Sequence, residues 1–80
     1  MNLYLLTQNV NTGYDTYDSA IVAAKDEDSA RKINPSEFSK FGGYNAWDWA
    51  VSPDQVTVKL IGKATKGTLE GVILASFNAG

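Results

Sequence analysis

The stretch Ser19-Ala-Ile-Val-Ala-Ala-Lys-Asp-Glu-Asp-Ser-Ala-Arg-Lys-Ile-Asn-Pro35 changes from an apolar run to a charged segment at Lys25. Residues 19–24 form a short apolar run without Gly or Pro, which favours a strand, and their alanines allow another element to pack closely. In the charged segment the acidic residues come first, the basic residues come last and a proline follows, which is typical of a helix. With Asp26 as a candidate N-cap, the sequence predicts a helix of about two turns over 26–33.

A second apolar run precedes this stretch. Residues 2–7 include Leu-Tyr-Leu-Leu and are followed by turn-forming residues 9–13, so they are predicted to form a strand. Both faces of this strand are apolar, which is typical of a central strand. The run lacks the basic flank and the cleavage site of a signal peptide, and no stretch approaches the roughly 20 apolar residues of a membrane span. We expect 2–7 and 19–24 to pair antiparallel across a long loop.

Two further strands are predicted in the C-terminal part. Residues 56–64 alternate apolar and polar side chains, and residues 71–77 form another apolar run after the turn region Lys66-Gly67. We expect these two strands to pair with each other. The strand order along the sheet is then expected to be 19–24, 2–7, 56–64 and 71–77.

The chain length and composition indicate a single domain. Eighty residues, of which 44% are hydrophobic and 20% charged, suffice for one modest core. The element order is strand, strand, helix, long loop, strand, strand. We therefore predict one α+β domain over 1–80, with a four-stranded, mainly antiparallel sheet that carries the short helix and an aromatic-rich loop on one face.

The residues that are absent narrow the function. Without cysteine or histidine the chain has no disulfide, thiolate nucleophile, imidazole ligand or Ser-His triad, so we expect neither an enzyme nor a bound cofactor or metal. The net charge of −2 gives no basic surface for a phosphate backbone, and nucleic acid is not an expected partner. No membrane partner is expected either, and the expected compartment is the cytoplasm.

The least regular segment, between Pro35 and Pro53, is rich in aromatic residues. One short helix cannot cover a four-stranded sheet, so this segment is expected to shield the rest of that face as a lid. Rigid rings also suit protein contacts, and some of them are expected to face a partner instead. The candidates for that contact are Tyr44, Trp47 and Trp49.

The loop over 9–18 is the second candidate contact surface, and it has three readings. Tyr14, Asp15, Tyr17 and Asp18 are predicted to form a recognition edge for a partner. The alternative is a turn-rich connection whose Asn and Asp side chains satisfy the backbone. A cation site is the third reading, but the spacing does not match a calcium loop of the EF-hand kind.

Three stretches carry a resemblance to a known group: residues 11–24, residues 27–31 and residues 71–80. The chain resembles small uncharacterised proteins encoded by tailed bacteriophages and prophages. The resemblance implies stoichiometric binding to a host protein inside the host cell, including inhibition of a host defence protein.

The functional expectation is thus a protein-binding module. Two alternatives remain open: a module for a small, nucleotide-like ligand, and a homo-oligomeric structural protein such as a homodimer. The homo-oligomer would pair the sheet face opposite the helix, because residues 3–6 and 72–77 are apolar on both sides.

Overall fold

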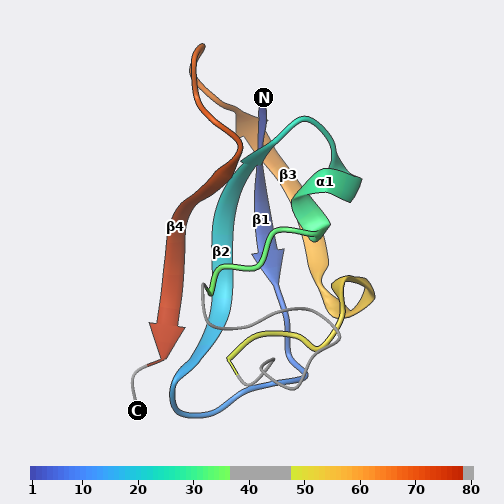
Figure 1. Ribbon diagram of the computed structural model, residues 1–80, viewed down its shortest axis with the longest axis vertical. Helices are drawn as coiled ribbons and strands as arrows, with labels where there is room; N and C mark the ends of the chain where they lie inside the picture. Colours follow the sequence, from blue (N-terminus) through green and yellow to red (C-terminus); the bar gives the residue numbers. More distant parts are fainter. Residues whose placement is uncertain (37–47, 79–80) are drawn as a thin grey trace.

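The computed structural model of the chain describes residues 1–36 and 48–78, which form an α+β fold with one four-stranded antiparallel sheet (Figure 1). This confirms the predicted fold class. Among these residues, no helix has the length and apolar character needed to cross a bilayer. In chain order the elements are β1 (Asn2–Thr7), β2 (Thr16–Ala24), α1 (Glu27–Arg31), the 3-10 turn η1 (Pro53–Gln55), β3 (Thr57–Lys63) and β4 (Gly71–Asn78).

The strands lie in the order β3-β1-β2-β4, and every neighbouring pair is antiparallel. The central place of β1 and its pairing with β2 are confirmed. The expected pairing of β3 with β4 is wrong, because these strands lie at opposite edges of the sheet (Figure 1). The turn is present, with the Thr68 N–H donating to the Thr65 carbonyl at 3.0 Å. A local turn does not choose strand partners, however. The inner positions belong to β1 and β2, the two strands that contain fully buried residues.

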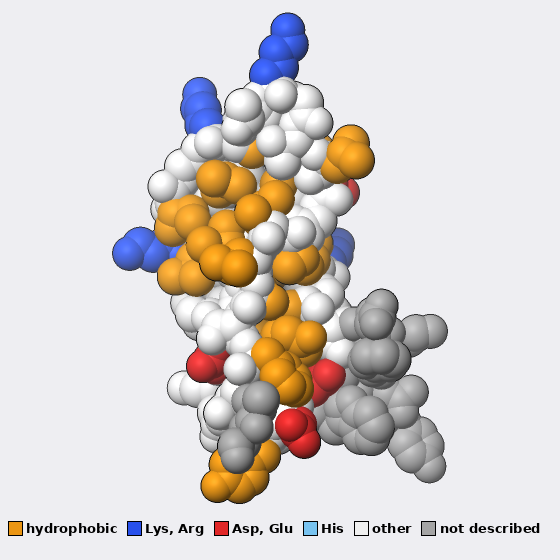
Figure 2. Space-filling model, turned by 90° about the vertical axis from the view of Figure 1, so that its left-hand side faces the viewer, with side chains coloured by type: hydrophobic (Ala, Val, Ile, Leu, Met, Phe, Trp, Pro, Cys, Tyr) orange, Lys and Arg blue, Asp and Glu red, His pale blue; other side chains and the backbone are white. Residues whose placement is uncertain are grey.

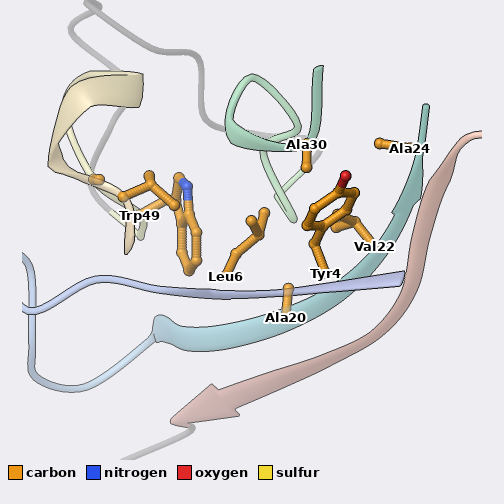
Figure 3. Close-up of a cluster of buried hydrophobic side chains, with 9 residues drawn as sticks. Tyr4, Leu6, Ala20, Val22, Ala24, Ala30 and Trp49 are labelled. Carbon is orange, nitrogen blue, oxygen red and sulfur yellow. The ribbon is translucent and has the colours of Figure 1, made fainter. Parts of the chain in front are cut away.

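The core lies on one face of the sheet (Figure 3). Side chains alternate along each strand, so Tyr4 and Leu6 of β1 and Val22 of β2 point to the same side and are buried. Ala30 of α1 and Trp49 cover them, and both are completely buried. The helix and the residues that precede η1 therefore form the layer that covers this face.

Helix α1 begins as predicted and ends earlier. Asp26 is the N-cap, and its carboxylate accepts a hydrogen bond of 2.7 Å from the Ser29 N–H. This bond stabilises the charged carboxylate and lowers the pKa of Asp26 below the ordinary value of 3.8. The helix ends at Arg31 rather than near residue 33. Beyond it, the Asn34 side chain accepts a hydrogen bond of 2.8 Å from the Ser36 N–H, a local turn that competes with helix continuation.

Candidate functional site

The connection between β1 and β2 is organised by one buried side chain. Gln8, 7% exposed, donates from Nε2 to the carbonyls of Asn11 at 2.7 Å and Tyr17 at 2.9 Å. Its Oε1 accepts from the N–H groups of Val10 at 3.1 Å and Asn11 at 2.9 Å. All polar atoms of this amide thus bind loop or strand backbone. The loop is therefore fixed at its first half, although its sequence is polar and turn-rich.

The second half of the loop is tied to the end of β4. The Gly13 carbonyl accepts from Thr16 Oγ1 at 2.9 Å and from Asn78 Nδ2 at 2.7 Å. The Asp15 N–H in turn donates to the Asn78 carbonyl at 2.6 Å. A further bond of 3.1 Å joins Asn11 Nδ2 to the Trp49 carbonyl. The loop is consequently anchored to two segments that are distant in sequence.

Two predicted contact residues, Tyr14 and Asp15, lie at the tip of this anchored loop. Tyr14 is 78% exposed. Asp15 is exposed as well and adopts φ 61°, the left-handed region that Asp tolerates better than most residues. The fixed backbone therefore presents a phenol ring and a carboxylate to solvent. Such an arrangement can bind a partner without the entropy loss of ordering a flexible loop.

Tyr17 and Asp18 do not lie in the loop, because β2 begins at Thr16, three residues earlier than predicted. The ring of Tyr17 is half-buried and its centroid lies 4.8 Å from that of Phe77 in β4. Asp18 is exposed at an irregularity in the pairing of β2 with β4. Tyr17 thus packs within the fold, whereas Asp18 stays available at the same end of the sheet as the loop.

The expected contact role of Trp49 does not fit its position. Its side chain is completely buried and packs in the core with Leu6, so it covers the sheet and is not available to a partner (Figure 3). Burial of the large indole ring removes its apolar surface from water, which stabilises the folded state. The lid role is confirmed for this residue. Tyr44 and Trp47, with most of the aromatic segment, lie outside the described residues.

The sheet face opposite the core is apolar at its centre. Leu5, Ile21 and Leu74 are adjacent in register and lie on this open face, where an antiparallel sheet in contact with water normally carries polar side chains. Figure 2 shows apolar side chains gathered on the side of the molecule formed by β4. The open face also contains a hollow of about 290 Å³, which is lined by Leu5, Ser19, Ala20, Ile21, Leu74, Ala75 and Ser76.

The loop tip offers a tyrosine ring and a carboxylate, and the open face of the sheet offers apolar side chains. Within residues 1–36 and 48–78, no three His, Cys, Asp or Glu side chains gather as a ligand set for a metal. No protein-family model, curated protein or solved structure matches the chain. The sequence did not reveal Gln8 and Asn78 as organisers of the loop, because a polar residue after a strand indicates a turn and nothing about its partners.

Proposed function

We propose that the protein is a binding module that engages another protein stoichiometrically through the loop between β1 and β2. One observation carries the proposal: Tyr14 is 78% exposed on a loop whose backbone is held by Gln8 from one side and by Asn78 from the other. Exposed tyrosines on rigid loops are favoured at protein interfaces, because the ring offers contact area at a low entropy cost.

The charges around the loop indicate the chemistry of the partner. Asp15 and Asp18 are exposed at this end of the sheet, and Asp54 of η1 is exposed near the start of β3, which pairs with the end of β1. Carboxylates at the rim of an interface increase the association rate with a basic surface. We infer a partner with a basic surface and a recess that accepts a tyrosine ring. The resemblance to phage proteins favours a host protein, and inhibition of a host defence protein is one form of this function.

A site-specific cross-link tests the proposal. A photoreactive phenylalanine analogue is placed at Tyr14, and the protein is irradiated in a host lysate. We expect one saturable cross-linked species that excess unmodified protein suppresses. The same analogue at Leu69, which is 83% exposed in the connection between β3 and β4, is the matched control and should give no such species.

The partner identified in this way is then titrated with purified variants. Tyr14→Ala is expected to raise the dissociation constant by roughly 30-fold, as for a typical interface hot spot, and Leu69→Ala is expected to leave it unchanged. Asp15→Asn keeps the backbone preference and removes the charge, so it should slow association at low salt. A partner that binds the Tyr14→Ala variant as tightly as the parent protein would refute the proposal.

A further inference from the structure

Strand β4 is held to the domain mainly by its pairing with β2. All 8 of its residues are described, and none of them is buried, whereas β1 and β2 both contain buried side chains. Helix α1 packs on β1, β2 and β3, and Figure 1 shows α1 and η1 on the side of the sheet where β3 lies, with β4 at the opposite edge. Within β4, Ala75 is partly buried and packs against the core. Most of the apolar surface of β4 therefore gains little from docking.

The pairing of β4 with β2 is also interrupted along its length. The register shifts at Asp18 of β2 and at Ile73 of β4, neither of which has an opposite residue in the other strand. An extra residue of this kind disrupts the backbone hydrogen bonds around it. A segment with few buried apolar contacts opens at a lower free energy than the core of a domain. We therefore expect β4 to detach from β2 at a lower free energy than is needed to separate β1 from its two neighbours.

The end of β4 is tied to the tip of the loop between β1 and β2, the binding loop of the proposed function. The Asn78 carbonyl accepts the Asp15 N–H at 2.6 Å, and Asn78 Nδ2 donates to the Gly13 carbonyl at 2.7 Å. These two bonds lie on either side of Tyr14 in the sequence. The bond from Thr16 Oγ1 to the Gly13 carbonyl is local and does not involve the Asp15 N–H. Detachment of β4 breaks both bonds to Asn78 together.

The two flanks of the loop tip have ties that do not depend on β4. On the first flank, Gln8 Oε1 accepts the N–H groups of Val10 at 3.1 Å and Asn11 at 2.9 Å. On the second flank, the Tyr17 N–H donates to the Asp48 carbonyl at 2.7 Å. Detachment of β4 therefore frees the tip between two points that stay fixed.

From this arrangement we infer that β4 is a detachable latch for the binding loop. Docked on β2, it fixes the loop tip in the conformation that presents Tyr14, and detached it releases the tip. This role rests on the proposed function for the identity of the site and adds how the site is regulated. A partner that binds the fixed tip binds only the docked state. Partner binding and β4 docking consequently stabilise each other.

Hydrogen exchange of the full chain, measured by NMR at several low urea concentrations, tests the latch without any partner. The Asp15 amide reports its bond to Asn78, and the β4 amides that bind β2 report docking. We expect these amides to share one opening free energy and one urea dependence, both smaller than those of the β1 amides. The Tyr17 amide is an internal control, because its acceptor belongs to Asp48, and it should not share this opening. If Asp15 exchanges freely while residues 74–76 stay protected, β4 does not hold the tip and the inference is wrong.

Two variants distinguish detachment of β4 from unfolding of the whole domain. Phe77→Ala removes the ring that packs on Tyr17, and the exchange rates of Asp15 and of the β4 amides should rise together by roughly 10-fold, as for the loss of one aromatic pair. Val58→Ala is the matched control, because Val58 is half-buried in β3, the other edge strand. It should leave the Asp15 rate unchanged, since β3 stays paired when β4 detaches. An Asp15 rate that rises equally in both variants means that β4 opens only with the whole domain, which overturns the inference.

The partner captured by cross-linking at Tyr14 tests the coupling. At about 100 times its dissociation constant, it should slow exchange of Asp15 and of β4 by about 100-fold. The amides of residues 71–74 are the decisive ones, because they lie at the end of the sheet away from the loop. Unchanged rates there with the partner bound would overturn the coupling and leave the proposed function standing. If no partner is captured, the proposed function fails, and exchange in the free protein still decides whether β4 holds the tip.

Discussion

Replacing Gln8 by alanine is expected to loosen the binding loop and to destabilise the whole domain. The substitution removes four hydrogen bonds, two donated by Nε2 and two accepted by Oε1. Each is worth about 0.5–1.5 kcal/mol, and water that enters the vacated space recovers part of this. The expected loss in unfolding free energy is about 2–3 kcal/mol. The total unfolding free energy of a domain of this size is roughly 4–12 kcal/mol, so the expected loss is a large fraction of it.

The measurement is urea unfolding followed by tryptophan fluorescence, together with the melting temperature, which should fall by about 10–20 °C. Gln55→Ala is the control. The Gln55 Oε1 accepts two hydrogen bonds, from the N–H groups of Val51 and Ser52, but it lies at the surface. Its loss should cost about 1 kcal/mol or less. If Gln8→Ala costs no more than Gln55→Ala, the claim that the buried amide holds the loop is refuted.

Three further outcomes are expected. Trp49→Ala should lower the unfolding free energy by about 3–5 kcal/mol and leave much of the protein unfolded at room temperature. Trp49→Phe should remain folded, and circular dichroism distinguishes the two variants. Asp15→Asn should leave stability unchanged, but Asp15→Val should cost about 1–2 kcal/mol in urea unfolding, because a β-branched residue is strained at φ 61°. The lowered pKa of Asp26 means that its stabilising effect is present above the ordinary value of 3.8 and is lost as the pH falls through the lowered value. Asp26→Asn should therefore lose less stability than the parent protein as the pH is lowered from neutral through the ordinary value of 3.8 and below it.

The elements of the fold were predictable because each depends on neighbouring residues. The run 2–7 forms β1 with the predicted bounds, and Asp26 caps α1 as its position in the charged segment indicates. The start of β2 was not predictable in the same way. Tyr17 and Asp18 look like loop residues, but β2 extends through them because β4 pairs alongside and supplies Phe77 as a contact for the Tyr17 ring.

The candidate site was predictable only in part. The composition of the loop drew attention to Tyr14 and Asp15, and both are exposed at its tip. Whether a ring is exposed or buried depends on what covers it, and Trp49 is buried where the sequence left a contact role open. The tie between Asn78 and Gly13 joins residues 65 positions apart and has no local sequence signal.

Taken alone, the chain determined its class of fold, the position of its helix and the polar character of its loop, because hydrophobic periodicity and capping act over a few residues. Only the tertiary structure decided that β3 and β4 lie at opposite edges of the sheet. The pairing of strands depends on how much surface each arrangement buries across the whole molecule. In this structure β1 and β2 take the inner positions, and Leu74 of β4 is exposed.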